Sequence, residues 1–173
     1  AADGATIRVA NGTYPIVSQL LLTRAVTLQS TNGYASTIIQ APQVSGVRLI
    51  LSHADARVEG FTMRGGASGN GAPGGGVLIT GDGGTLYNCR VTGNRSQAYD
   101  GFGAGIHMIA GRVARCVIDA NHQAIDSVRG GGVYHAGGIL ENCLILTNTT
   151  YSMTQNSGGG VYFYRSSSTG LMR

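Results

Sequence analysis

Three evenly spaced cysteines constrain the fold of this chain more than any other feature of its sequence. Cys89, Cys116 and Cys143 are equally spaced along the chain, and the segments around them align in register. An asparagine follows each cysteine at the same distance, at Asn94, Asn121 and Asn148. A glycine-rich cluster and a short apolar segment complete each copy. Such self-similarity, with a period of about 27 residues, is typical of repeat architectures in which each unit packs mainly on its neighbours.

The composition of each copy indicates strands. Short runs of β-branched and aliphatic residues alternate with Gly or Asn, and no segment has helical periodicity. An earlier copy places Phe61 one repeat before Cys89. A unit this short cannot bury its apolar face alone, so successive units must coil and stack. The sequence therefore predicts an all-β parallel solenoid with coils of about 20–29 residues.

The repeat extends through the chain as one domain, residues 1–173. Residues 1–60 predict shorter, irregular coils, and residues 61–173 predict regular coils of about 27–29 residues. Within a coil we expect Leu86, Cys89 and Val91 to point inward. Inward residues on one straight strand are two apart, so the spacing of three predicts a bend at Asn88.

Composition and charge exclude several classes of protein. The 12 basic residues are all Arg and stand singly along the chain, against 8 acidic residues, for a formal charge of +4. Nucleic-acid-binding proteins concentrate such charge on one face, so we expect no nucleic acid partner. No apolar run reaches the roughly 18 to 20 residues of a membrane helix, which argues against membrane insertion by this segment.

Two sequence features resemble those of a known superfamily. They are the opening Ala-Asp-Gly-Ala-Thr-Ile-Arg-Val-Ala-Asn-Gly-Thr-Tyr and the repeated Gly-Gly-Gly-Val-Tyr and Asn-Cys units. They resemble the right-handed parallel β-helix (pectate-lyase-like) superfamily, and within it the repeats of surface and autotransporter-type proteins such as chlamydial polymorphic outer-membrane proteins. The resemblance implies a right-handed coil and a bacterial protein that is secreted or on the cell surface. Members include lyases, hydrolases, tailspikes and adhesins, so the resemblance leaves the chemistry open. It also implies that the chain is a fragment of a longer protein.

The cysteine and asparagine rows are interpreted as structural ladders. Equivalent positions on stacked coils give the thiols parallel Cβ directions, which favours packing over a disulfide. A disulfide and a redox or metal role are the alternatives for the cysteines, although no Cys or His spacing is typical of a metal site. Stacked asparagine amides can satisfy one another and the turn backbone.

The variable segments between the asparagines and the glycine clusters form the candidate functional face. They span residues 67–73, 95–102, 122–129 and 149–157. Asp100 and Asp126 are separated by almost one repeat, so their carboxylates could approach each other as the acid and base of a glycosidase or as Ca²⁺ ligands. The alternative is that Arg95 and Arg129 simply pair with them in solvent.

A second candidate surface consists of aromatic residues. The alignment of the Gly-Gly-Gly-Val-Tyr units places His107, Tyr134 and Tyr162 on the outer surface, where they could stack against sugars or merely cover the strands. The same alignment turns His135 inward, as a core histidine with a backbone partner.

These features favour a non-catalytic, extracellular scaffold or adhesin segment that contacts a polysaccharide or a cell-surface glycan and needs no cofactor. The alternative is a polysaccharide lyase or glycoside hydrolase that acts at Asp100 and Asp126, with Ca²⁺ as its metal. Clustered acids for Ca²⁺ are missing, and the chain has no Lys. Uncapped terminal coils would expose unpaired strand edges, which predicts end-to-end self-association of this chain.

Overall fold

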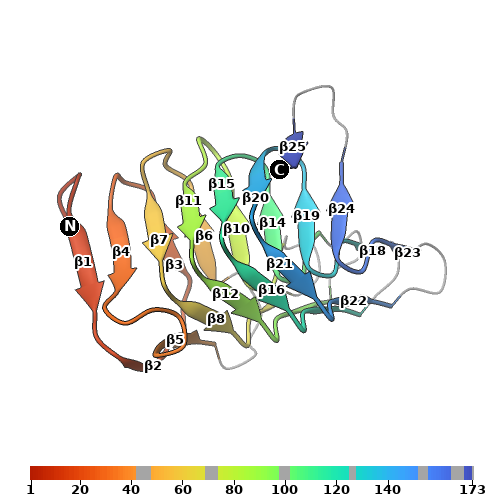
Figure 1. The fold of residues 1–173 in the computed structure, drawn as a ribbon, viewed down its shortest axis with the longest axis horizontal. Coiled ribbons are helices and arrows are strands. Elements are labelled where there is room, and N and C mark those ends of the chain that lie inside the picture. Colours follow the sequence, from red (N-terminus) through yellow and green to blue (C-terminus); the bar gives the residue numbers. More distant parts are fainter. Residues whose placement is uncertain are drawn as a thin grey trace.

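The computed structural model is a parallel β-solenoid of about five turns (Figure 1), which confirms the predicted all-β class. The structure describes residues 1–41, 48–68, 74–97, 102–124, 128–151, 156–164 and 170–172. These described residues form strands and connections but no helix. Asp100 and Asp126 both lie outside them.

Three long parallel sheets form the walls of the solenoid, and we name them sheets A, B and C. Sheet A contains β1 (Thr6–Val9), β4 (Thr27–Ser30), β7 (Arg57–Glu59), β11 (Thr85–Tyr87), β15 (Arg112–Ala114), β20 (Gly138–Glu141) and β25 (Gly170–Met172). Sheet B contains β2 (Gly12–Pro15), β5 (Thr37–Gln40), β8 (Thr62–Arg64), β12 (Arg90–Thr92), β16 (Val117–Asp119) and β21 (Leu144–Leu146). Sheet C contains β3 (Leu20–Leu22), β6 (Leu49–Leu51), β10 (Val77–Ile79), β14 (Ile106–Met108), β19 (Val133–His135) and β24 (Val161–Phe163).

Two shorter sheets lie along the variable segments. Sheet D contains β9 (Ala67–Ser68), β13 (Arg95–Ser96), β17 (His122–Gln123) and β22 (Thr149–Thr150). The fifth sheet pairs β18 (Val128–Arg129) with β23 (Asn156–Ser157). The described parts of the variable segments therefore stack on one another as the coils do.

The strand register follows the repeat in the sequence. Leu86 pairs with Val58 on one side and Val113 on the other, and Val113 pairs in turn with Leu140. Backbone hydrogen bonds continue through the turns, as where the Val117 N–H donates to the Cys89 carbonyl at 2.9 Å. Each coil thus obtains its hydrogen bonds from the coils on either side.

The coils formed by residues 1–60 are uneven rather than uniformly short. Thr6 pairs with Thr27, and Thr27 pairs with Arg57, so the second of these coils contains more residues than the first. Part of this difference comes from the connection between β4 and β5 at residues 31–36, which is longer than the connection between β1 and β2 at Ala10 and Asn11.

The bend between sheets A and B has left-handed backbone geometry. Asn88 and Asn142 have φ values of 47° and 51°, which explains why inward positions change spacing there. Asparagine tolerates this region better than most residues. Arg115 occupies the equivalent corner with φ of 54°, so the bend is kept even where the preferred residue is absent.

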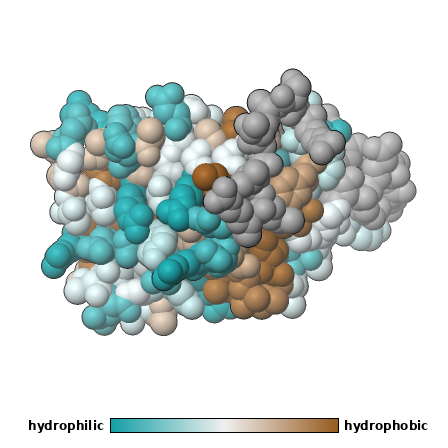
Figure 2. All heavy atoms as spheres, turned by 45° about the horizontal axis from the view of Figure 1, so that its top comes forward, coloured by the Kyte–Doolittle hydropathy of each residue, from teal (hydrophilic) through white to brown (hydrophobic). Residues whose placement is uncertain are grey.

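The core is one continuous apolar column inside the coils. Phe61, Met63, Leu86, Ile106 and Ile118 are among its largest side chains and are essentially inaccessible to solvent. Exposed apolar side chains occur mainly near the two ends, including Leu144 and Leu146 on the outer face of β21. Figure 2 shows a matching contrast, with hydrophilic groups over the early coils and a brown area among the later ones.

The inward and outward assignments can be tested by comparing two substitutions. Val133 is fully buried, whereas Arg95 is exposed on β13. Val133→Asp is expected to unfold the chain, because a carboxylate in an apolar interior costs several kcal/mol. Arg95→Ala is expected to change the free energy of unfolding by well under about 1 kcal/mol. Thermal melting of both variants measures the difference, and equal shifts would contradict the assignments.

Candidate functional site

The three asparagines form a hydrogen-bonded ladder along the solenoid. The Asn94 Nδ2 donates to the Asn121 Oδ1 at 3.0 Å, and the Asn121 Nδ2 donates to the Asn148 Oδ1 at 2.9 Å. Asn94 and Asn121 are 1% and 0% exposed. These amides therefore lie in the interior, at the turn between sheets B and D.

Each amide in the ladder also satisfies the backbone. The Asn121 Oδ1 accepts a second hydrogen bond from the Asn94 backbone N–H at 3.0 Å. The second Nδ2 hydrogen of Asn121 goes to the Val91 carbonyl at 2.9 Å. Every polar atom of this side chain is used within the protein, so the ladder is a structural element and offers nothing to a ligand.

The glycine clusters make room for this ladder. A Cβ atom added at Gly105 would lie 2.8 Å from the Asn121 Nδ2, and one at Gly132 would lie 2.8 Å from the Asn148 Nδ2. Both contacts are shorter than van der Waals distance, so a larger residue there would displace the asparagine amide. The Gly-Gly-Gly-Val-Tyr motif and the asparagine row are therefore two halves of one packing arrangement.

The cysteines form a column of free thiols. Cys89 and Cys116 are buried and Cys143 is half-buried, and none is in a disulfide. The Sγ atoms of Cys116 and Cys143 lie 3.7 Å from the carbonyls of Leu86 and Val113. The neighbouring Cys116 thiol and burial raise the pKa of Cys143 above its ordinary value. Such thiols stay protonated, which makes them poor nucleophiles and poor metal ligands.

The ladder can be tested at its middle residue. Asn121→Ala removes four hydrogen bonds and leaves the buried backbone N–H of Asn94 without its acceptor. We expect a loss of about 3 kcal/mol or more in the free energy of unfolding, measured by chemical denaturation. Asn32→Ala is the matched control, because Asn32 donates to Asn11 in solvent. This control should cost under about 1 kcal/mol, and a similar loss in both variants would contradict the role of the ladder.

The aromatic row on sheet C has the expected register but not the expected exposure. His107 pairs with Tyr134, which pairs with Tyr162. Phe102, which forms an isolated bridge with Arg129, lies over the row, with ring centroids 5.3 Å from His107 and 4.5 Å from Tyr134. His107 and Tyr134 are consequently only 7% and 5% exposed. The expectation of a flat outer strip is wrong for these two residues, because a side chain from the variable segment covers them.

The accessible part of this cluster lies toward the later coils. Tyr134 stacks with Tyr162 at 5.5 Å between ring centroids and with Tyr164 at 6.0 Å. The Arg129 guanidinium lies 5.7 Å from the Tyr162 ring centroid. Tyr162 is half-buried and Tyr164 is exposed, so both present ring surface to solvent, and Tyr162 does so beside a cation.

Burial makes His107 a weak base. Among the described residues its Nδ1 atom has no hydrogen-bond partner, and desolvation lowers its pKa from 6.5 to about 4. His135 on the inward side is 1% exposed, and burial lowers its pKa as well. The ring of His135 packs 4.7 Å from that of Phe163, as expected of a core residue.

The depressed pKa of His107 predicts a pH-dependent stability. Between pH 6.5 and about 4 the His107 imidazole is protonated in the unfolded chain but neutral in the folded protein. The free energy of unfolding should therefore fall as the pH drops from 6.5 to about 4, and His107 should cause no further loss below that pH. The loss from His107 should reach about 3 kcal/mol at most. His107→Leu should flatten this part of the profile, although His135 still contributes. Denaturation midpoints that fall in parallel for both proteins would contradict the assignment.

The remaining predicted residues fall partly inside and partly outside the described ranges. Arg95 is exposed on β13 and pairs in register with His122 on β17, whose Nδ1 lies 2.7 Å from the Thr149 Oγ1. The predicted approach of Asp100 to Asp126 falls outside the described residues. Within the part of the chain that the structure describes, no three His, Cys, Asp or Glu residues gather closely enough to hold a metal ion.

Sequence reasoning missed a groove on the outer face of sheet B. A groove of about 760 Å³ lies on the outer face of β5, β8 and β12, where Arg64 and Arg90 project. Alternation on these strands could have marked both arginines as outward. The groove itself could not be foreseen, because Tyr34 and Ala35 of the connection at residues 31–36 form part of its lining.

The chain was compared with protein-family models, with curated proteins and with solved structures, and none of them matches it. In the described ranges, no helix is long and apolar enough to cross a membrane. The geometry of the surface is therefore the basis for any functional assignment.

Proposed function

We propose that this chain is a non-catalytic β-solenoid segment of a secreted or cell-surface bacterial protein, serving as an extended scaffold that contacts glycans. The observation that carries the proposal is that polar side chains of the repeat form hydrogen bonds and ion pairs with neighbouring coils. The Asn121 amide is saturated by its neighbours, and Arg90 pairs with Asp119, and Arg112 with Glu141, on adjacent coils. Side chains engaged in this way stabilise a stack and are not free for catalysis.

The proposal includes membership of the pectate-lyase-like superfamily, close to the autotransporter-type repeats. Its support is the Gly-Gly-Gly-Val-Tyr and Asn-Cys spacing together with the parallel coils. The glycan contact is assigned to Tyr162, Tyr164 and Arg129. Exposed aromatic rings next to a cation suit the apolar faces and hydroxyl groups of sugars.

A polysaccharide-active enzyme is the second candidate. Its support is that Val128 and Arg129 of β18 pair in parallel with Asn156 and Ser157 of β23, so that consecutive variable segments run side by side. Asp100 and Asp126 belong to such segments. An enzyme of this kind would place its acid and base, or a Ca²⁺ ion, on that face.

One set of assays separates the two candidates. The chain is incubated with acidic and neutral polysaccharides, with and without Ca²⁺, and both depolymerisation and retention on immobilised polysaccharide are measured. We expect retention without depolymerisation, and loss of retention on the neutral polysaccharides in the Tyr162→Ala, Tyr164→Ala double variant. Tyr14→Ala is the control, because Tyr14 is an exposed tyrosine on β2 in sheet B. Depolymerisation that disappears in the Asp100→Asn, Asp126→Asn double variant would overturn the scaffold proposal.

A further inference from the structure

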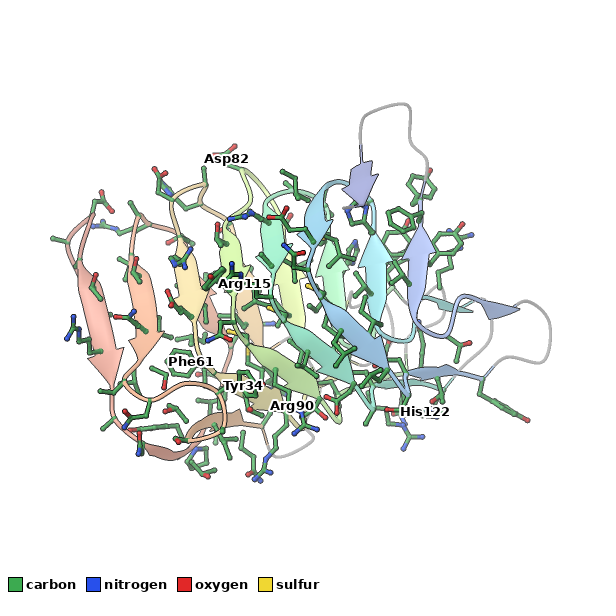
Figure 3. All side chains as sticks on the ribbon, viewed as in Figure 1. Tyr34, Phe61, Asp82, Arg90, Arg115 and His122 are labelled. Carbon is green, nitrogen blue, oxygen red and sulfur yellow. The ribbon has the colours of Figure 1, made fainter. Side chains whose placement is uncertain are left out.

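The groove on sheet B, which we call the sheet B groove, spans three consecutive coils. Its lining includes Gln40 from β5, Thr62 and Arg64 from β8, and Arg90 and Thr92 from β12. Figure 3 shows the labelled Tyr34 and Arg90 near each other beside these strands. The volume of about 760 Å³ is within the range of small-molecule sites.

The groove exists because one connection is longer than its counterparts. Between β4 and β5 the chain runs through residues 31–36, whereas Asn88 and Cys89 alone join β11 to β12. Tyr34 in this longer connection forms one wall. The Thr62 hydroxyl donates to the Tyr34 carbonyl at 2.8 Å and holds the connection against β8. A side-chain to backbone hydrogen bond therefore fixes this wall of the groove.

The charge of the groove is positive. Arg90 is neutralised by Asp119, with its Nε 3.0 Å from Oδ1, and this contact holds the pKa of the Asp119 carboxyl below its ordinary value. Arg64 instead donates from Nη2 to the neutral Gln40 Oε1 at 2.8 Å. Among the described residues Arg64 has no carboxylate within salt-bridge distance. Within the described ranges, the lining of the groove thus contains one guanidinium that no carboxylate neutralises.

We propose that the sheet B groove binds an anionic saccharide, with its anionic oxygens on Arg64 and its hydroxyl groups on Gln40 and Tyr34. A guanidinium offers paired donors in a plane, which suits carboxylate, sulfate ester and phosphate ester groups alike. The Gln40 Nε2 and the Tyr34 hydroxyl form no hydrogen bond within the described residues, so both are available to neutral hydroxyl groups. This site lies on a different sheet from Tyr162 and Tyr164 and does not depend on them.

Binding to the 173-residue chain can be measured by titration calorimetry with four probes. These are an oligouronate, a sulfated dextran oligomer, a glycerol phosphate oligomer and a neutral dextran oligomer. At least one anionic probe should bind more tightly than the neutral one, and the tightest anionic probe identifies the anionic group. No binding of any anionic probe, or equal binding of the neutral one, would overturn the proposal.

Two arginine variants then separate a built site from general charge attraction. Arg64→Gln removes the uncompensated guanidinium, and we expect it to raise the Kd by about tenfold or more. Arg8→Gln changes the net charge equally but lies exposed on β1 in sheet A, so its Kd should change by less than about twofold. An equal rise of the Kd in both variants would show attraction by net charge only and would overturn the proposed binding site in the sheet B groove.

The tyrosine variants keep this proposal separate from the proposed function. Anion binding should be unchanged in the Tyr162→Ala, Tyr164→Ala double variant, because neither residue lines the groove. Loss of binding in that variant but not in Arg64→Gln would place the anion at the sheet C aromatic cluster and contradict the sheet B groove. Circular dichroism of each variant checks that the solenoid remains folded.

Discussion

The structure depends on hydrogen bonding between equivalent positions of successive coils. A coil of this solenoid has almost no partners within itself, and its strands bond to strands roughly one repeat away, as Val113 does with Leu86 and Leu140. Parallel pairing fails where the chain turns between sheets B and D. There the amides of Asn94, Asn121 and Asn148 take over the role of the backbone. Glycine at positions 105 and 132 follows from this arrangement, since the amides occupy the space of a side chain.

The features that repeat were predictable from the sequence, and the features that occur once were not. The constant spacing of the repeat fixed the register of Cys89, Cys116 and Cys143, and the alternation of apolar residues separated inward His135 from outward His107. The burial of His107 was not foreseen, because it depends on Phe102, a single residue in a variable segment. The periodicity of the sequence predicts whether a strand side chain points inward or outward. It does not predict which other side chains cover it.

The sheet B groove illustrates the same limit. Arg64 and Gln40, like Arg90 and Asp119, lie on neighbouring coils, so their contacts follow from register once the coils are aligned. The groove itself follows from the longer connection at residues 31–36, which has no counterpart in the later copies. The outer face of sheet B also changes along the stack. Polar Thr62 and Arg90 share a column with apolar Val117 and Leu144. A fixed interior therefore supports outer surfaces of different character on the same sheet.

Successive coils make the same contacts with their neighbours, and this equivalence determines how such a chain can change in length. Gly103 and Gly130 begin equivalent coils, and their φ values are 59° and 71°. Removing the coil between them would leave Asn94 facing Asn148, in the same contact that each now makes with Asn121. Duplicating that coil would add one more asparagine to the ladder and lengthen the solenoid by about 4.8 Å along its axis. Recombination between repeats can therefore lengthen or shorten this protein in whole coils without redesigning its interior.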